Sequence, residues 1–551
     1  RDKFKDEPPS EDHNYDGSRT KGCIKEVSLI AHNCRYDFSF LVEHLSACGL
    51  KPIMKGNNLM GGSAVIYVNN HKDRNSDNKI KISYENNKGE MVDEYVAPFI
   101  KINFQDSYNL ISKPLKDFME MFKLDCKKEI LPYSLYSTEN IKKKLVDKKE
   151  CLSHIDKEDD KKEYLQNAKE WNCLVGDFVD IIKYSKKYCE MDCKVLKKGY
   201  DTFRSWIIEV CDLDIINYCS IASLSMDYLI QEGCFSSDIQ EDIGYDIEKM
   251  RKYFCYKLSG RPRDFIQKCV VGGRTMCRDN KKWKVEGRIN DFDAVSLYPS
   301  AMYRMKGFLK GIPKVIKKEN LNIDWLLGHY PQPKNSKSTP DGFFVKVMAI
   351  NDAEEHGFPL LSNDEDDGIR NFSNETKGNI YYLDKVGLED AMNFQKIKFN
   401  VICGYYYDDG HNNKINSVMK HLFNTRIEAK KNDNPIQEIY KLLMNSSYGK
   451  TLLKPIETDT NVISKKAFPK YLSRNYNFIR EITESGDKMI IKETKVIDEH
   501  YNNCYAGVEV LSMSKRIMNE VMCLAQEKKL TIYYQDTDSM HLKDKDIKIW
   551  K

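Results

Sequence analysis

The sequence predicts a mixed α/β (α+β) chain with several domains, and three observations support this fold class. The chain has 551 residues, which is enough for three or four domains with cores of their own. Near its start, a strand-like run is followed by a polar turn and an amphipathic helical run. Further along, strand-like runs alternate with turn clusters and then give way to a long helical pattern.

The elements of the first half can be placed in order. Glu26 to Ala31 (EVSLIA) predicts a buried strand, and the run from Phe38 to Gly49 predicts an amphipathic helix that glycine ends. Residues 141–170 are dense in both charge signs, which predicts a solvated helical face or a surface insertion without chemistry. Apolar spacing resumes over residues 171–200, and a polar linker at 236–248 places a domain boundary between 215 and 240.

The second half continues with strands and helices. The runs at 342–350 and 396–407 predict strands, and the spacing over 415–450 predicts a long helix. A final pair of short strands surrounds Asp536.

Composition narrows the class of protein. With 41% hydrophobic and 31% charged residues, 28 Gly and 16 Pro, the chain is globular and not collagenous or disordered. The 87 basic and 83 acidic side chains nearly cancel, so net charge decides nothing about nucleic acid. No apolar run reaches the length of a membrane span, and no membrane partner is expected. Seventeen scattered cysteines without a CxxC pair indicate reduced thiols in an intracellular protein, with nucleus, cytoplasm and mitochondrion all open as compartments.

Three acidic residues form a candidate metal site. Asp293 stands at the end of a strand in DFDAVSLYPS, and Asp536 and Asp538 lie at the turn between two short strands in YYQDTDS. Mg²⁺ takes oxygen ligands and keeps waters and phosphates in the rest of its shell, so two or three carboxylates suit it. This set indicates two-metal phosphoryl transfer, although an Asp-rich turn alone is also ordinary turn chemistry.

A helical stripe strengthens this interpretation. In IYKLLMNSSYGK, Lys441, Asn445 and Tyr448 are spaced i, i+4 and i+7, and such a stripe suits a triphosphate, a sugar and a base better than a core. Arg426 and Lys430, again four apart, are candidates for the same phosphate site, with a solvated helix face as the alternative.

These segments together carry a family resemblance. DFDAVSLYPS, KLLMNSSYGK and YQDTDS, in this order, resemble motifs A, B and C of family B DNA polymerases. Lys450 directly after Tyr448-Gly449, and the 85 residues between Lys450 and Asp536, resemble the protein-primed branch, which includes polymerases of linear phage, adenovirus, plasmid and transposon genomes. The resemblance implies an RNase H-like 3′–5′ exonuclease domain followed by the palm and fingers of a right-hand polymerase.

The resemblance assigns roles in the polymerase site. Asp293 and Asp538 would hold two Mg²⁺ ions, with Mn²⁺ as an alternative, and Asp536 would assist. Tyr298 would stack under the deoxyribose and exclude a 2′-hydroxyl. The implied nucleotide-binding residues are Ala294, Ser296, Leu297, Tyr298, Arg426, Lys430, Lys441, Asn445 and Tyr448. The implied partners are template-primer DNA, dNTPs and a terminal protein primer.

The resemblance extends to the first third of the chain. AHNCRYDFSFL and YCEMD resemble the second and third exonuclease motifs, so Asp37 and Asp192 would be metal ligands and Tyr188 would orient water, with Lys128 at the basic position. The implied DNA-binding residues are Asn33, Tyr36, Ser107, Gly272, Gly273, Arg274, Ser446, Gly449 and Lys450. Among these, the two glycines permit close backbone approach and Arg274 would neutralise a phosphate.

Some features depart from the family pattern. No Asp-x-Glu triplet precedes Asn33, so we expect negligible hydrolysis from Asp37 and Asp192 alone. Tyr108 stands where the family has Leu, and Val270 where it has Tyr. The chain begins with Arg1 and stops 12 residues after Ser539, before the family's Lys-x-Tyr motif and thumb, so we expect both ends to be truncated and the thumb to be absent.

The expected domains follow from these motifs. They are an exonuclease-like domain at 1–215, a connecting and template-binding segment at 216–290, a palm with a first insertion at 291–411, fingers at 412–450, and a palm with a second insertion at 451–551. Two alternatives stay open: an RNA-primed, cellular-type family B polymerase, and a degenerate remnant that only binds DNA.

Overall fold

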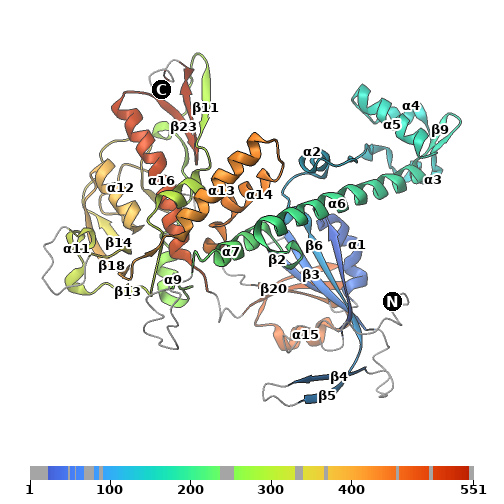
Figure 1. Cartoon of the computed structure of the whole chain (residues 1–551), viewed down its shortest axis with the longest axis horizontal. Coiled ribbons are helices and arrows are strands. Elements are labelled where there is room, and N and C mark those ends of the chain that lie inside the picture. The colour runs from blue at the N-terminus through green and yellow to red at the C-terminus, as the bar shows by residue number, and fades with distance from the viewer. Residues whose placement is uncertain are drawn as a thin grey trace. The chain divides into compact units, whose positions relative to one another are not determined.

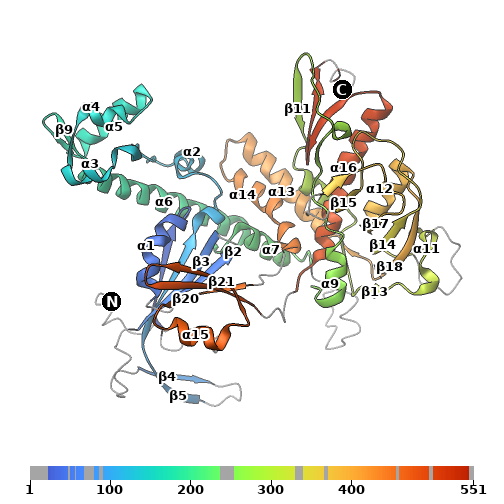
Figure 2. The same cartoon turned by 180° about the vertical axis from the view of Figure 1, so that it is seen from behind.

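The chain divides into two compact units, which are described separately (Figures 1 and 2). The first unit comprises residues 1–220 and 456–496, and the second comprises residues 221–455 and 497–551. This computed structural model describes residues 23–46, 50–55, 58–67, 80–85, 91–235, 254–328, 339–364, 370–453, 458–495, 501–544 and 546. The predicted linker at 236–248 lies outside the described residues.

The first unit combines short strands with one very long helix. Its elements in chain order are β1 (Cys23–Ala31), α1 (Arg35–Ser46), β2 (Lys51–Lys55), β3 (Asn58–Tyr67), β4 (Ile80–Glu85), β5 (Met91–Val96), β6 (Phe99–Asp106), η3 (Ser107–Asn109), η4 (Leu115–Asp117), α2 (Phe118–Phe122), η5 (Tyr133–Leu135), α3 (Thr138–Lys143), β7 (Leu145–Asp147), α4 (Lys148–Ser153), α5 (Glu158–Glu170), β8 (Leu174–Val175), β9 (Phe178–Asp180), α6 (Ile181–Cys211), η6 (Ile215–Asn217), β20 (Thr458–Ser464), α15 (Phe468–Asn475), β21 (Ile479–Ser485) and β22 (Lys488–Thr494).

The central sheet of the first unit has the strand order β1-β6-β3-β2. Its strands β1 and β6 are parallel, whereas β3 is antiparallel to both of its neighbours. The predicted strand at Glu26 to Ala31 is confirmed as part of β1, and the predicted helix begins earlier, at Arg35. Helix α1 packs on the sheet through a small core that includes Leu45, Ala64 and Phe104. The sheet thereby fixes the loop between β1 and α1, where the exonuclease-like motif lies.

Helix α6 is the longest element of the first unit, with 31 residues. It begins at a capped end, because the side chain of Asp180 accepts a hydrogen bond from the backbone N–H of Lys183 at 2.9 Å. Gly199 allows α2 to pack closely, since a Cβ at this position would lie 2.4 Å from the ring of Phe118. The helix therefore presents Tyr188 and Asp192, one turn apart, on a rigid element.

The charge-rich region at 141–170 forms more than a solvated face. Charged pairs such as Lys161–Glu158 do lie on the exposed side of α5. Its other side is apolar and contributes to a core with α6, in which the rings of Tyr164 and Tyr184 lie 4.5 Å apart. This region is a small packed module, because a few apolar residues among the charges recur on one helix face.

Residues 458–494 form a second module of the first unit. Three antiparallel strands in the order β20-β22-β21 pack with α15, and β20 lies beside β2 of the central sheet (Figure 2). Val462 of β20 contacts the core beneath α1. This segment falls in the range predicted as the second palm insertion, and in the structure it belongs to the unit that carries the exonuclease-like motifs.

The second unit contains the following elements. In chain order they are α7 (Ile221–Gln231), α9 (Gly260–Gln267), β10 (Thr275–Cys277), η7 (Arg278–Asn280), β11 (Ile289–Asp293), α10 (Leu297–Arg304), β12 (Phe308–Leu309), β13 (Lys314–Val315), η8 (Lys318–Asn320), α11 (Ile323–Leu327), β14 (Gly342–Ala349), β15 (Ser362–Asp364), β16 (Arg370–Phe372), β17 (Ile380–Asp384), α12 (Lys385–Gln395), β18 (Phe399–Tyr407), β19 (His411–Asn412), α13 (Lys414–Lys431), α14 (Gln437–Ser446), η9 (Gly449–Leu452), α16 (Cys504–Glu527), β23 (Ile532–Asp536) and β24 (Ser539–Lys543).

Two antiparallel sheets and helix α16 organise the second unit. One sheet has the order β10-β23-β24-β11 and the other β13-β18-β14-β17. Helix α16 packs against α10 and α12, and its residues Met518 and Met522 join Ile532 and Leu542 of the first of these sheets in one core. The strands predicted at 342–350 and 396–407 are confirmed as β14 and β18.

The long helix predicted over 415–450 is wrong as a single element. The chain forms two helices, α13 and α14, separated by a turn that contains Asp433 with a positive φ of 48° and Pro435. Proline lacks an N–H and clashes with the preceding helical turn, which explains the break. As a result, α13 and α14 pack against each other and both contact α10.

None of the helices in the described ranges is long and apolar enough to cross a membrane.

Candidate active site

The predicted acidic residues meet at one end of the sheet β10-β23-β24-β11. Strand pairing places Asp293, the last residue of β11, opposite Ser539 of β24, and Asp536 pairs with the same Ser539 across the hairpin. The backbone N–H of Ala294 donates a hydrogen bond of 2.7 Å to the backbone oxygen of Asp538. The two segments that carry the acids are therefore tied to each other directly beside the carboxylates.

The electrostatics of these carboxylates reflect their proximity. Burial raises the pKa of Asp538, and the negative charges of Asp293 and Asp536 raise it further. No ion pair to a lysine, arginine or histidine engages any of the three within the described part of the chain. Repulsion between uncompensated carboxylates is what a bound cation relieves.

No group of three or more His, Cys, Asp or Glu is preassembled as a metal cluster in the described ranges.

Asp536 differs from the other two acids in its hydrogen bonding. Its Oδ1 accepts a hydrogen bond of 2.7 Å from the hydroxyl of Thr275 and lies 3.4 Å from the hydroxyl of Thr537. Thr275 was missed by the sequence analysis, and it is the residue directly after the Gly-Gly-Arg sequence.

The start of α10 carries an aromatic ring that stacks on a ring from just after the end of α14. Ser296 has a positive φ of 51°, and Leu297 and Pro299 are buried, which anchors the first turn. The ring of Tyr298 stacks on that of Tyr448 with 4.4 Å between centroids and 26° between planes. Burial raises the pKa of the Tyr448 hydroxyl, and its hydrogen bond to Tyr298 raises it further. The structure therefore brings together the two tyrosines that the sequence placed 150 residues apart.

Helices α13 and α14 carry the other predicted nucleotide-binding residues. The side chain of Asn416 on α13 donates to three carbonyl oxygens at the end of α10, at 2.7–3.1 Å, which fixes the two helices together. Arg426 of α13 contacts the hydroxyl of Ser296 at 3.5 Å. Lys441 is half-buried and Asn445 exposed on one side of α14, and Lys430 is exposed near the end of α13.

Three residues predicted to contact DNA lie at the end of α14 and just after it. Ser446, Gly449 and Lys450 are half-buried, and Gly449 has open space where a Cβ would lie. The Lys450 ammonium donates to the hydroxyl of Ser223 on α7 at 3.2 Å.

The prediction for Arg274 is corrected by the structure. Its side chain is only 4% exposed, and its guanidinium donates to Gln535, Asn519 and the backbone oxygens of Phe358 and Pro359 at 2.7–3.1 Å. A guanidinium that is buried and hydrogen-bonded in this way is not available to a DNA phosphate. The neighbouring Gly272 and Gly273 are exposed, but a Cβ on Gly273 would lie 2.6 Å from the side chain of Thr537.

In the first unit, four predicted exonuclease residues lie close together. Lys128 pairs with Asp192 at 3.4 Å, and its ammonium lies 5.7 Å from the centre of the Tyr188 ring. The Oδ1 of Asp192 is buried and accepts no hydrogen bond within the described residues, so it fits a cation. Burial raises the pKa of the Cys189 thiol, and the charges of Asp192 and Asp37 raise it further, which places both carboxylates near this cysteine.

The same cluster contains a residue that was not predicted. The hydroxyl of Tyr133 hydrogen-bonds to that of Tyr188 at 3.1 Å. Burial raises the pKa of Tyr188, with further contributions from Tyr133 and Asp192. Tyr188 is therefore a neutral hydrogen-bonding group at this site.

The residues predicted to bind DNA near the loop between β1 and α1 differ in their exposure to solvent. Tyr36 is 73% exposed and meets Phe40 edge to face at 5.0 Å, so its ring can be reached by a base. Asn33 is exposed, and its backbone N–H donates to the buried carboxylate of Asp106. Ser107 is corrected: it is fully buried and its hydroxyl donates to the backbone oxygen of Ala31.

Asp106, missed by sequence reasoning, anchors this loop by accepting hydrogen bonds from three backbone N–H groups, those of Asn33, Cys34 and Tyr108. The signal for it was an aspartate at the end of a buried strand, directly before Ser107.

The fold and the site define the class: an exonuclease-like unit and a unit with the palm and fingers of a right-hand polymerase. Structures of phi29 DNA polymerase match 94% of this chain, one with primer-template DNA at TM-score 0.53 and 18% identity over 71% of that chain, another in an orthorhombic crystal form at TM-score 0.56 and 14% identity over 72%. The predicted fold class is confirmed by these likenesses.

The family model described as "DNA polymerase type B, organellar and viral" matches residues 22–528, and the chain belongs to this family. A "Probable DNA polymerase" of Ascobolus immersus is 23% identical over 80% of this chain and 33% of its own length, and one of Neurospora intermedia is 24% identical over 79% and 42%. The chain thus spans between a third and about two fifths of these relatives. The predicted family resemblance is confirmed.

The core behind the sheet β10-β23-β24-β11 predicts a dependence of the free energy of unfolding on pH. His356 is buried, accepts a hydrogen bond from the N–H of Phe358 at 3.0 Å and lies near the charge of Arg274. Burial, followed by the charge of Arg274, lowers the pKa of His356 to about 4. Between pH 6.5 and about pH 4, His356 is protonated in the unfolded chain but neutral in the folded chain. The free energy of unfolding therefore decreases as the pH falls through this range.

We expect the loss to reach about 3 kcal/mol below pH 4. Urea unfolding at pH 7.0, 5.5 and 4.5 measures it, with His356→Asn as the comparison, because Asn retains an acceptor but does not titrate. The variant should lose less stability than the wild type over this range; parallel profiles would contradict the assignment.

Proposed function

We propose that this chain is a DNA-templated DNA polymerase that adds dNTPs to a growing strand by nucleotidyl transfer. The observation that carries the proposal is the convergence of Asp293 and Asp538, linked by the Ala294–Asp538 backbone hydrogen bond, beside the stacked pair of Tyr298 and Tyr448. Carboxylates without basic partners next to an aromatic shelf suit a metal-bound triphosphate with its sugar and base. The family to which the chain belongs supports the same activity.

The proposed cofactor is Mg²⁺, with two ions at the polymerase site and Mn²⁺ as a substitute. Asp293 and Asp538 would hold the ions, with the backbone oxygen of Ala294 as a further ligand and Asp536 nearby. When bound, the metal would supply charge compensation for the attacking hydroxyl and for the leaving phosphates. The fit rests on the donor set, which is three carboxylates with no basic side chain paired to them in the described chain.

The protein's own residues would orient the dNTP. Lys441, Arg426 and Lys430 would contribute positive charge along α13 and α14 for the phosphates. Tyr298, held by its stacking on Tyr448, would form the floor under the sugar, where a 2′-hydroxyl would meet the ring. Asn445 lies one helical turn from Lys441 on α14, and it would contact the base or the sugar.

The first unit would contribute an exonuclease fold with part of the metal site of a 3′–5′ exonuclease. Asp37 and Asp192 would hold a cation there, Lys128 and Tyr188 would flank it, and the exposed ring of Tyr36 would stack on the primer end. The buried, unpartnered oxygen of Asp192 supports this proposal.

Two alternatives lead to different results. A degenerate DNA-binding remnant would keep the fold without the chemistry, and the unpaired carboxylates together with the Tyr298–Tyr448 stack favour the enzyme instead. A cellular-type, RNA-primed polymerase would keep the chemistry but use a different primer.

Neutralising one metal-site carboxylate should abolish nucleotide addition. We expect Asp538→Asn and Asp293→Asn to lower the single-turnover rate of primer extension by several orders of magnitude, because each amide loses the charge that holds the cation. The fold should persist, since removing one charge relieves repulsion among the acids. Primer extension with Mg²⁺ and dNTPs measures the rate, and thermal unfolding checks the fold.

The matched control is Asp192→Asn in the first unit, which should leave primer extension intact. Hydrolysis of the primer 3′ end should be negligible in both proteins, because Asp37 and Asp192 alone do not hold two ions. A folded Asp538→Asn variant that extends primers at the wild-type rate would refute the metal assignment. A wild-type protein that shifts DNA in a gel but adds no nucleotide would favour the remnant.

Sugar selection should depend on Tyr298. Tyr298→Val removes the ring that the structure stacks on Tyr448, so a ribose 2′-hydroxyl would find space. We expect the ratio of ribonucleotide to deoxyribonucleotide incorporation to rise by at least about tenfold in single-turnover assays. Tyr298→Phe keeps the ring and should keep the wild-type ratio, and an unchanged ratio in the Val variant would show that Tyr298 does not line the sugar pocket.

We further propose that synthesis is protein-primed, which requires a protein hydroxyl to reach the in-line position beside the metals. Support comes from Lys450 after Tyr448-Gly449 and from the folded module at 458–494 between motifs B and C. Incubated with its terminal protein, Mg²⁺ and one labelled dNTP, the polymerase should form a covalent protein–nucleotide adduct. If no adduct forms and RNA primers are extended readily, the cellular-type alternative is the better interpretation.

A further inference from the structure

The segment Gly273–Arg274–Thr275 contacts the catalytic hairpin at three consecutive points. The backbone N–H of Thr537, at the hairpin turn, donates to the backbone oxygen of Arg274 at 2.9 Å. A Cβ on Gly273 would lie 2.6 Å from the side chain of Thr537, so the glycine lets the two residues pack closely. The hydroxyl of Thr275 donates to Oδ1 of Asp536 at 2.7 Å. The turn that carries two of the three acids is therefore held from one side by this segment.

The segment is itself fixed by the buried guanidinium of Arg274. It reaches Gln535 of β23 at 2.7 Å, Asn519 of α16 at 2.9 Å and the backbone oxygens of residues 358 and 359. Burial lowers the pKa of Arg274 to about 10, which still leaves it charged at neutral pH. Because the side chain has satisfied acceptors on three separate segments, it sets the position of the backbone on either side of it.

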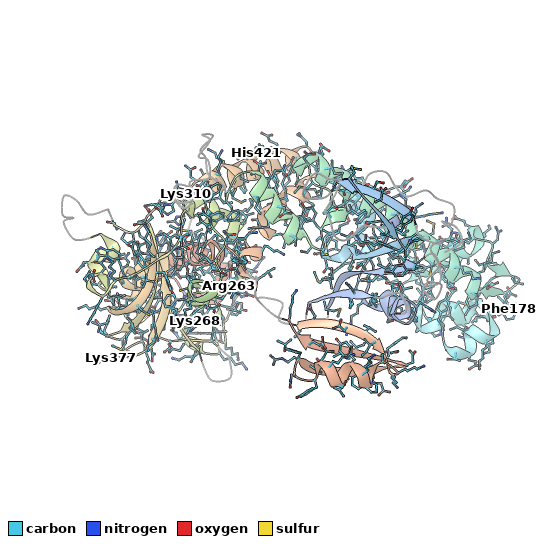
Figure 3. The ribbon with its side chains drawn as sticks, turned by 90° about the horizontal axis from the view of Figure 1, so that it is seen from below. Phe178, Arg263, Lys268, Lys310, Lys377 and His421 are labelled. Carbon is cyan, nitrogen blue, oxygen red and sulfur yellow. The ribbon has the colours of Figure 1, made fainter. Side chains whose placement is uncertain are left out.

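The loop before Arg274 is held at its other end as well. Lys268, labelled in Figure 3, follows α9, and its ammonium lies 5.3 Å from the centre of the Tyr382 ring. The ammonium of the half-buried Lys515 donates to the backbone oxygen of Val271 at 3.0 Å. The Gly272-Gly273 loop thus connects two anchored ends, and the downstream end is the one that meets the hairpin.

Asp536 is the acid on which this arrangement acts. Strand pairing places Thr275 opposite Asp536, and its hydroxyl takes one lone pair of Oδ1. This hydrogen bond restricts rotation of the carboxylate. A freely rotating Asp536 could approach Asp538, whose pKa already reflects the charges of Asp293 and Asp536 in addition to burial.

We propose that Thr275 is a positioning residue, which holds Asp536 so that the hairpin presents Asp538 and Asp293 to the metal ions, and that residues 273–275 act on catalysis through this hairpin. The inference rests on the proposed polymerase function and goes beyond it, because it gives the residues after the Gly-Gly pair a role toward the metal site. Thr275 touches neither substrate nor metal in this role and acts through Asp536.

The exposure of Thr275 makes the proposal testable without loss of the fold. The residue is exposed, and Thr275→Val keeps its shape and β-branching while removing the hydroxyl. Thr275→Ser keeps the hydroxyl and is the conservative rescue. Thr458→Val, at an exposed strand position in the first unit, is the matched control for the same substitution elsewhere.

The experiment measures metal binding apart from activity. Mn²⁺ is titrated by electron paramagnetic resonance into the protein without DNA, in an Asp192→Asn background that removes binding by the first unit. Thr275→Val should weaken Mn²⁺ binding by about tenfold, the size expected when a hydrogen bond that orients a charged group is lost. Thr275→Ser and Thr458→Val should bind as the background protein does, and thermal unfolding midpoints should agree within about 2 °C.

Single-turnover primer extension is then measured against Mg²⁺ concentration. Thr275→Val should need about tenfold more Mg²⁺ for half of its maximal rate, and saturating Mg²⁺ should restore most of that rate. A purely structural role would instead lower the unfolding midpoint and leave the Mg²⁺ requirement unchanged.

The outcomes separate this inference from the proposed function. Wild-type Mn²⁺ binding and Mg²⁺ dependence in Thr275→Val would overturn the positioning role while leaving the polymerase function intact. Equal losses in the Val and Ser variants would also overturn it, because the hydroxyl would not be the cause. If the wild-type chain adds no nucleotide, the proposed function fails, and the Mn²⁺ titration still decides whether Thr275 orients the acids.

Discussion

Holding like-charged carboxylates together costs free energy. In the second unit, backbone hydrogen bonds around a single turn offset this cost. Asp536 and Asp538 lie at the turn of a hairpin, and Asp293 ends the strand that pairs with it. Backbone hydrogen bonds from Ala294 and Thr537 hold the turn from its two sides. Because these bonds do not depend on the protonation of the acids, the arrangement persists while the carboxylates repel each other. The segment that contains the buried Arg274 lies directly beside this turn.

The buried polar network behind the sheet explains how so short a strand as β10 keeps its place. Three residues of strand contribute little by themselves, but Arg274 adds four charge-assisted hydrogen bonds in a site closed to water. A second network on α16 lies nearby: Arg516 pairs with Asp390, whose pKa burial raises to about 6 although Arg516 opposes the shift. Helix α16 therefore carries buried charges as well as apolar contacts, and one helix face aligns the sheet with the layer behind it.

The sequence predicts the strands and motif residues that depend on local pattern. It does not predict whether a side chain is buried when its hydrogen-bond partners are distant in the sequence. The strands at β1, β14 and β18 and the motif residues at Asp293 and Asp536 follow from alternation, spacing and turn chemistry. The burial of Arg274 does not, because its partners Asn519 and Gln535 lie 245 and 261 residues away. An arginine after two glycines has the same local pattern whether it binds a phosphate or a buried carbonyl. Ser107 was misassigned for the same reason, since its acceptor is Ala31, 76 residues earlier.

The two carboxylate sites differ in whether a basic side chain compensates their negative charge. This difference determines how each site keeps its geometry when no cation is bound. In the first unit, Lys128 already pairs with Asp192 at 3.4 Å, so part of the charge is compensated by the protein and one carboxylate oxygen is left buried without a partner. In the second unit, no ion pair within the described residues compensates Asp293, Asp536 or Asp538. A site with a built-in lysine is ordered before any cation arrives. A site with none depends on neutral hydrogen bonds to hold its geometry before a cation arrives, and the hydroxyl of Thr275 donates one of these bonds to Asp536.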